Sequence, residues 1–288
     1  MSASASPARA AFVDLHTHST ASDGVLSPER VIEAAERCGL AAIALTDHDT
    51  INGIPAARAA AGSSGLRVIA GVELSAFQDD QEIHLLALHL SRLDRLEKRL
   101  GELRTLRHAR AAQIVEKLNS LGVELSLDEV LRQSNGGAVG RPHVARAMIA
   151  RGFANDFRDA FARFLGNGGS AFVPKAKLSI EDAIRIAHEA GGLAILAHPG
   201  DGGRRERLEL MVAAGLDGVE VKHPSHSSED VKRLQALADF FGLVQSGGSD
   251  WHGATDGPRR LGNMNVPVEW LEKQDEKVAA IASASVGK

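Results

Sequence analysis

The strongest constraint on the fold is a regular alternation of short apolar runs with longer amphipathic stretches. The apolar runs have the length of strands and lie at residues 10–16, 41–47, 67–76, 82–90, 193–199, 216–224 and 243–250. Helical patterns follow many of them, at residues 27–40, 53–65, 179–192, 204–215 and 227–242. Strands that alternate with helices at this spacing predict an α/β domain built on a parallel sheet or barrel.

A second kind of sequence interrupts this alternation. Residues 93–168 contain several helical patterns and no convincing strand, and the first pattern runs from Leu93 to Gly122. We expect residues 1–92 and 169–288 to form one catalytic barrel and residues 93–168 to form a helical insertion that caps the site and recognises substrate.

Histidines and carboxylates gather where the predicted strands end. They are His16, His18 and Asp23 after the first strand, then Asp47, His48 and Asp49, then Glu73, His84, His198, Glu220, His223, His226, Asp250 and His252. The carboxyl ends of parallel strands meet at one face of such a fold, so these side chains are expected to converge there.

The residue types indicate a metal site. His16 and His18 are two positions apart on a strand, so both point the same way and can hold one ion. Cys38 is the only cysteine, which excludes a thiolate cluster, and imidazole with carboxylate suits Zn, Mn or Fe. The ligands are too many for one tetrahedral ion, so two or three ions with a bridging carboxylate are expected.

Other residues of these types are given simpler roles. His89, His108 and His188 have no acidic partner in the pattern and are interpreted as ordinary core or surface histidines. Asp49 is interpreted as a turn cap and Asp14 as a residue that orients its neighbours.

The composition limits the kinds of partner that this protein is expected to have. A formal charge of −4 gives no global basic field of the kind that generic nucleic-acid binders carry. Residues 1–11 contain no secretory apolar segment, and no run is long and apolar enough to span a membrane. We therefore expect a cytoplasmic protein with no membrane contact and no obligate protein partner.

Taken together, the motifs resemble the polymerase and histidinol phosphatase (PHP) superfamily. The segments "DLHTHSTASDG", "LTDHDT", "GVELS", "IHLLAL", "AHPG" and "GSDWHG" occur in that superfamily's order. "GRPHVARAMIARG" in the insertion and "GVEVKHPSHS" resemble its branch of nucleotide phosphatases and 5′-3′ exoribonucleases, the ribonuclease AM-like branch. The resemblance implies a distorted (β/α)7 barrel of parallel strands with a trinuclear metal site.

The resemblance also implies roles for individual residues. The first metal would be held by His16, His18, Glu73 and Asp250, the second by Asp23, His48 and His252, and the third by Glu73, His84 and His198. Glu73, Asp250 and His198 would be the catalytic residues. Three divalent ions are expected, with Mn preferred over Zn or Fe, and they would generate a metal-bound hydroxide and neutralise the phosphoryl oxygens.

The resulting prediction is a phosphoric ester hydrolase for 3′,5′-bisphosphonucleotides, 5′-phosphorylated short single-stranded RNA, or both. A histidinol-phosphate-type phosphatase and a non-catalytic, metal-stabilised module are the alternatives. All nine ligand types implied by the resemblance are present in this chain, which argues against the non-catalytic alternative.

The substrate side depends on fewer residues. Arg141 and His143 open a helix, where N–H groups and a guanidinium suit a second phosphate, and His226 is added by the resemblance. The alternative is that Arg141 is a solvated helix residue. Phe172, Lys177 and Asp201 depart from the residues usual in the branch, which bears on base stacking and phosphate binding.

Overall fold

The computed structural model describes residues 12–62, 64–79, 81–134, 139–174 and 177–286. The polar N-terminal tail and most of the glycine-rich stretch before Arg141 lie outside the described residues. None of the helices in the described residues is long and apolar enough to cross a membrane.

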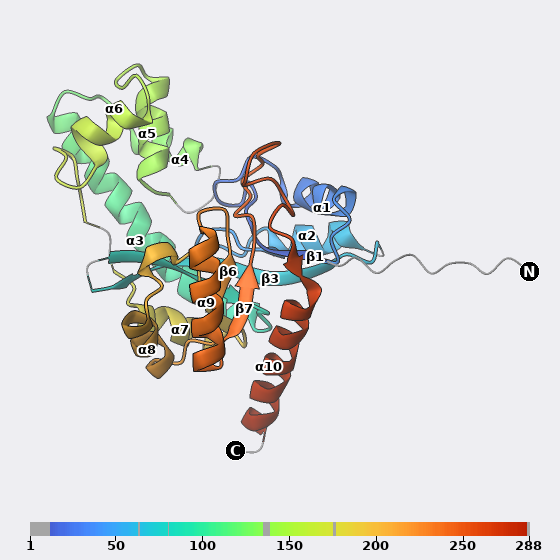
Figure 1. The fold of residues 1–288 in the computed structure, drawn as a ribbon. Coiled ribbons are helices and arrows are strands. Elements are labelled where there is room, and N and C mark those ends of the chain that lie inside the picture. Colours follow the sequence, from blue (N-terminus) through green and yellow to red (C-terminus); the bar gives the residue numbers. More distant parts are fainter. Residues whose placement is uncertain (1–11, 63, 80, 135–138, 175–176, 287–288) are drawn as a thin grey trace, which may run out of the picture.

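Eight strands form one sheet that curls into a nearly closed barrel (Figure 1). The strands are β1 (Phe12–Thr17), β2 (Ala42–Leu45), β3 (Arg67–Gln78), β4 (Gln81–Leu88), β5 (Leu193–Leu196), β6 (Gly218–Lys222), β7 (Val244–Gly247) and β8 (Val266–Pro267). Their order is β7-β6-β5-β4-β3-β2-β1-β8. Just beyond β7, the Trp251 carbonyl accepts a hydrogen bond from His18 N at 2.8 Å, which brings that end of the sheet back to β1.

The predicted α/β barrel with a helical insertion is confirmed, but its strands are not all parallel. β1, β2 and β3 run parallel to one another, as do β5, β6 and β7. β4 is antiparallel to both β3 and β5, and the short β8 is antiparallel to β1. Only two residues separate β3 from β4, and a parallel pairing needs a much longer crossover, so the chain must reverse there.

Six longer helices surround the barrel, and capping residues explain where several of them begin. They are α1 (Pro28–Arg37), α2 (Ile54–Ala61), α7 (Ile180–Glu189), α8 (Arg205–Ala213), α9 (Ser228–Phe241) and α10 (Val268–Val286), with a short 3-10 turn η2 (Gly200–Gly202). Ser227 and Asp230 form a capping box at the start of α9. Ser27 occupies the cap position of α1 as expected, although its side chain makes no capping hydrogen bond.

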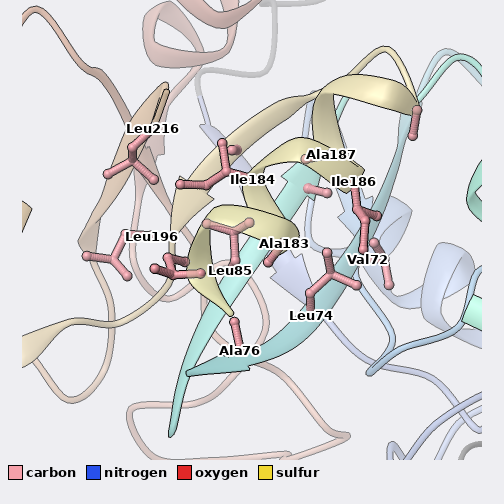
Figure 2. Close-up of a cluster of buried hydrophobic side chains, with 14 of the residues drawn as sticks. Val72, Leu74, Ala76, Leu85, Ala183, Ile184, Ile186, Ala187, Leu196 and Leu216 are labelled. Carbon is pink, nitrogen blue, oxygen red and sulfur yellow. The ribbon is translucent and has the colours of Figure 1, made fainter. Parts of the chain in front are cut away.

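The alternation of side chains along β3 separates the core from the site. Val72, Leu74 and Ala76 point outward and pack against Ala183 and Ile184 of α7 (Figure 2). The residues between them, such as Glu73, point to the opposite face of the strand. One strand therefore contributes both to the apolar core and to the barrel interior.

The insertion has helices of its own and a core of its own. It contains α3 (Leu93–Ser120), α4 (Leu127–Gln133), α5 (Arg141–Ala150), α6 (Phe157–Ala160) and a π-helical turn η1 (Phe161–Leu165). The first half of α3 packs Leu96 and Leu100 into the barrel core, whereas Ile114 and Leu118 in its second half pack into the insertion core. α3 is therefore one continuous helix that belongs to both regions (Figure 1).

Candidate metal centre

His16 and His18 lie side by side at the end of β1, and both are almost fully buried. Their Nε2 atoms each lie 3.2 Å from Oε2 of Glu73. The same two nitrogens lie 3.5 Å and 3.2 Å from Oδ1 of Asp250, beyond the end of β7. The four residues bring their donor atoms within 4.8 Å of one another, which is the spacing of ligands around one ion.

Glu73 lies at the middle of the cluster and presents its two oxygens to different histidines. Oε2 faces His16 and His18 and lies 3.3 Å from Nδ1 of His48. Oε1 lies 2.7 Å from Nδ1 of His84 and 3.0 Å from Nε2 of His198. A carboxylate placed in this way can bridge two ions.

A second group lies closer to solvent. Oδ1 of Asp23 lies 3.2 Å from Nε2 of His252, and its Oδ2 lies 3.9 Å from Nε2 of His48. His18 lies between this group and the first, because its Nδ1 is 3.8 Å from Asp23 Oδ1. These four residues again bring their donor atoms within 4.8 Å of one another.

The structure thus brings together all nine residues that the sequence analysis named as ligands. Their chemistry fits divalent cations, since the donors are imidazole nitrogens and carboxylate oxygens without a thiolate. His18 gives a further indication, because both of its ring nitrogens are buried and neither has a well-aligned hydrogen-bond partner. A buried polar atom without a partner is costly, and coordination would satisfy it.

The charges of the cluster are strongly coupled. Burial lowers the pKa of His18, but the carboxylates of Asp250 and Glu73 outweigh it and raise that pKa to about 9. Burial lowers the pKa of His48 to about 3. Burial raises the pKa of Glu73, yet His48, His16 and His84 together hold it well below the ordinary range. Such divergent values are typical of functional sites.

Two buried aspartates shape the loops that carry the candidate ligands. Asp47 accepts hydrogen bonds from Ser19 N at 2.7 Å and from the Ser22 hydroxyl at 2.7 Å, which folds the loop that ends in Asp23. Asp14 accepts from Ser249 N and from Gly262 N, both at 2.9 Å, and so anchors the segment that leads to Asp250. Asp14 therefore orients its neighbours, as its position in the sequence suggested.

Glu220 and His223 also lie at the centre, as expected of residues near the ends of strands, although neither was among the nine predicted metal ligands. Glu220 Oε1 lies 3.1 Å from Nδ1 of His16, and its Oε2 accepts a hydrogen bond from His198 N at 2.8 Å. His223 Nε2 lies 3.5 Å from Asp250 Oδ2. The sequence did carry a signal for Glu220, because it is an acidic residue in a largely apolar strand. A carboxylate at such a position is costly to bury unless another group pairs with it.

A cleft of about 280 Å³ runs from the metal centre to the insertion. On the barrel side it is lined by Asp23, His48 and His84, and on the insertion side by Arg107, Arg110, Arg141, His143 and Arg146. We call it the arginine cleft. Four guanidinium groups opposite the candidate metal ligands make this cleft suited to an anion.

Arg141 and His143, which the sequence suggested as phosphate-binding residues, both line the arginine cleft. One guanidinium nitrogen of Arg141, Nη1, donates to the Leu165 carbonyl at 3.1 Å and to Asn167 Oδ1 at 3.2 Å. His143 Nδ1 accepts from Gly140 N at 3.0 Å, and its Nε2 is buried without a hydrogen-bond partner. Burial lowers the pKa of His143 to about 4.

Arg107 and Arg110 were not predicted from the sequence as site residues, and they lie three residues apart on one face of α3. Arg107 is largely but not fully buried, and burial lowers its pKa to about 10. It forms an ion pair with Asp49 and donates to the Ser75 hydroxyl at 3.4 Å. Asp49 therefore does more than cap a turn, because it ties the barrel to α3.

His226 does not line the arginine cleft. Its Nδ1 donates to the Val221 carbonyl at 2.8 Å, and its Nε2 accepts from Gly200 N at 3.2 Å. Both ring nitrogens are thus engaged in holding the turn after β5.

The three departures from the branch pattern have different surroundings. The Arg141 guanidinium carbon, Cζ, lies 5.7 Å from the centre of the Phe172 ring. Lys177 Nζ lies 5.8 Å from the centre of the Phe77 ring. Asp201 is exposed, and its carbonyl accepts from Arg204 Nε at 3.1 Å.

Comparisons with known proteins agree with this geometry. A family model described as the PHP domain matches residues 14–166. The chain is 37% identical over 260 residues to the 3′,5′-nucleoside bisphosphate phosphatase of Chromobacterium violaceum, with 88% of this chain and 91% of that protein covered. It is 37% identical over 251 residues to the 5′-3′ exoribonuclease Rnm of Salmonella typhimurium, with 84% and 86% covered.

A solved structure from Bifidobacterium adolescentis, described as that of a metal-dependent phosphoesterase, superposes with a TM-score of 0.79. It is 32% identical, and the match covers 91% of this chain and 94% of that one.

Proposed function

This chain belongs to the PHP family, and we propose that it is a metal-dependent phosphoesterase that hydrolyses 3′,5′-bisphosphonucleotides, 5′-phosphorylated short RNA, or both. The single observation that carries this proposal is the juxtaposition of two features. One is the histidine and carboxylate cluster around Glu73, and the other is the arginine cleft that opens directly onto it.

Three divalent ions, with manganese preferred, would be held by the nine residues named from the sequence. His16, His18, Glu73 and Asp250 would hold the first, Asp23, His48 and His252 the second, and Glu73, His84 and His198 the third. When bound, such ions lower the pKa of water and neutralise charge on phosphoryl oxygens. Glu73 would set their separation, and Glu220 would hold His16 and His198 in position.

The arginine cleft would bind the phosphate that is not cleaved. Arg141 and Arg110 reach it from different helices, and a guanidinium binds phosphate through two parallel hydrogen bonds. His143 contributes a buried ring nitrogen at the same place. A substrate with two phosphates would thus place one at the cluster and one in the cleft.

We propose that residues 93–168 act as the substrate-recognition cap of the barrel. Arg107 and Arg110 are on the part of α3 between its barrel half and its insertion half, so the cap and the cluster are joined by one helix. The ion pair between Arg107 and Asp49 would help to keep the cap at a fixed distance from the histidine and carboxylate cluster.

The test is a substrate panel with the enzyme stripped of metal and then reconstituted with Mn. We expect hydrolysis of adenosine 3′,5′-bisphosphate or of a 5′-phosphorylated oligoribonucleotide, and weak hydrolysis of a 5′-hydroxyl oligoribonucleotide and of histidinol phosphate. Preference for histidinol phosphate would favour the small-molecule alternative. Inactivity on every substrate with Mn, Zn and Fe would favour the non-catalytic alternative.

A further inference from the structure

A second cavity lies beside the metal centre, on the far side of His84 from the arginine cleft. Its volume is about 440 Å³, and it lies between the start of β4, the end of β5 and helix α8. His84 and His198 form the part that faces the cluster. We call it the β4–β5 cavity.

The cavity exists because two paired strands separate. β4 and β5 pair from Leu88 to Leu85, and Ala197 N donates to the His84 carbonyl at 3.0 Å. Beyond that bond, β4 continues as one arm of the β3–β4 hairpin, whereas the other chain turns into η2 at Gly200. The opening between them leads from the candidate ligands to the outside of the barrel.

The two cavities are neighbours that share lining residues but differ in character. Glu82 and His84 line both of them. The arginine cleft is lined by four guanidinium groups, of which that of Arg107 is paired with Asp49. The β4–β5 cavity is lined mainly by apolar side chains, among them Ile83, Leu196, Pro199 and Met211, with the carboxylate of Glu82 and the guanidinium of Arg207 as its charged groups besides the histidines. Arg207 is held by a hydrogen bond from its Nε to Gln78 Oε1, which leaves its Nη atoms for other contacts.

We propose that the β4–β5 cavity binds the second nucleotide of a 5′-phosphorylated RNA chain, with its nucleoside on the apolar lining and the following phosphate at Arg207. This inference rests on the proposed function. Apolar side chains accommodate any base, and a guanidinium suits the backbone phosphate, so the pocket would bind without strong sequence preference.

The chemistry explains why one centre would need both cavities. In a 3′,5′-bisphosphonucleotide and in a 5′-phosphorylated RNA, the same bond can break, between phosphorus and the 3′ oxygen of the first nucleotide. Oxygen from water joins the phosphorus, and the 3′ oxygen leaves with a proton as a hydroxyl. The leaving nucleotide is identical in the two reactions and would occupy the arginine cleft.

The two substrates differ only on the side that stays attached to phosphorus. A bisphosphonucleotide carries nothing more there, whereas RNA carries its next nucleotide. A cavity on the other side of His84 from the arginine cleft is in the right place to receive that nucleotide. The β4–β5 cavity would therefore decide how well the enzyme acts on RNA relative to bisphosphonucleotides.

The test compares Arg207→Ala with the wild-type enzyme on a 5′-phosphorylated triribonucleotide and on adenosine 3′,5′-bisphosphate. We expect kcat/KM for the triribonucleotide to fall about tenfold or more, mainly through KM, because a hydrogen bond to a charged group is lost. The value for the bisphosphonucleotide should stay within about twofold. Arg205→Ala is the matched control, because Arg205 lies on the same helix but stacks on Phe240, 4.5 Å away.

A second variant guards against a fold defect. Gln81→Glu is nearly isosteric, lies at the exposed rim of the cavity and adds one negative charge, so it should weaken triribonucleotide binding alone. Equal losses on both substrates, or no loss on either, would overturn the assignment. A wild-type enzyme that cleaves only the bisphosphonucleotide would also overturn it while leaving the proposed function in place. Inactivity on both substrates would instead refute the proposed function.

Discussion

The carboxylate of Glu220 lies 3.1 Å from Nδ1 of His16, on the side of the ring opposite to Glu73. An acidic partner on one ring nitrogen leaves the other directed at the cluster and makes the ring a stronger ligand. The second oxygen of Glu220 accepts the His198 main-chain N–H, so one side chain fixes two candidate ligands.

We therefore predict that Glu220→Gln weakens Mn binding by about 10- to 100-fold, the usual cost of losing such a partner. Direct titration of metal-free protein with Mn, followed by measurement of the bound stoichiometry, checks this. Glu209→Gln on the exposed face of α8 is the control and should bind like the wild type. Unchanged affinity in the Glu220 variant would show that the carboxylate is structural only.

Glu73→Gln should be more damaging than any single histidine substitution in the cluster. Glu73 faces five histidines through two oxygens, and an amide can neither bridge two ions nor balance their charge well. Turnover should fall by orders of magnitude while circular dichroism stays native, whereas His84→Asn should retain more activity. Near-native turnover of a metal-replete Glu73 variant would refute the bridging role.

Arg141→Ala should discriminate between substrates. The variant removes a cation from the arginine cleft, so kcat/KM for a bisphosphonucleotide should fall. The decrease should correspond to a loss of about 1.5–3 kcal/mol of transition-state stabilisation. An aryl phosphate, which has only the reacting group, should be hardly affected.

Arg141 also holds the Leu165 carbonyl, so its replacement could loosen the insertion. Arg158→Ala, an exposed arginine of the same insertion, is the control, and thermal denaturation should be recorded for both variants. Equal losses on the two substrates would assign Arg141 to the fold or to the chemistry, and no loss on either would make it a solvated helix residue.

Asp217 gives a prediction about stability that does not involve the metal centre. Its carboxylate accepts from Ala194 N at 2.9 Å and lies 2.7 Å from Nε2 of His188, so it joins α7 to β5. Asp217→Asn removes the charge and should cost about 1–3 kcal/mol at pH 7, measured by urea denaturation.

The pH dependence of this effect has a defined sign. Burial raises the pKa of Asp217, but His188 and the Ala194 N–H outweigh it and hold the pKa below the ordinary 3.8. A depressed pKa means that the stabilisation is complete above pH 3.8 and is lost as the pH falls through the folded-state value. The difference between the wild type and Asp217→Asn should therefore shrink as the pH falls below about 4. A difference that persists undiminished in acid would contradict this account.

The sequence was most informative where local periodicity decides the outcome. His16 and His18 point the same way because strand side chains alternate, and strands that end at one face bring His48, His198 and Asp250 toward them. The α/β barrel and its helical insertion follow from the same patterns.

Features that depend on the packing of distant elements could not be predicted. Arg107 meets Asp49 only because α3 crosses over the barrel, and no spacing in the sequence gives that angle. To predict the direction of β4, the two-residue connection between β3 and β4 would have to be recognised as a hairpin turn. β8 and α10 follow residue 252, where no element had been predicted, and α10 is held partly by tertiary contacts such as that of Lys277 with the Asp217 carbonyl.

The central claim is that Glu73 bridges metal ions that the nine residues hold. It is tested most directly by a crystal structure of the Mn-reconstituted enzyme with anomalous data at the manganese edge. The account predicts two or three peaks, with at least one on the His16 and His18 side of Glu73 and one on the His84 and His198 side. Well-ordered crystals grown with Mn that show no peak at Glu73, or a single peak on one side of it, would contradict the account.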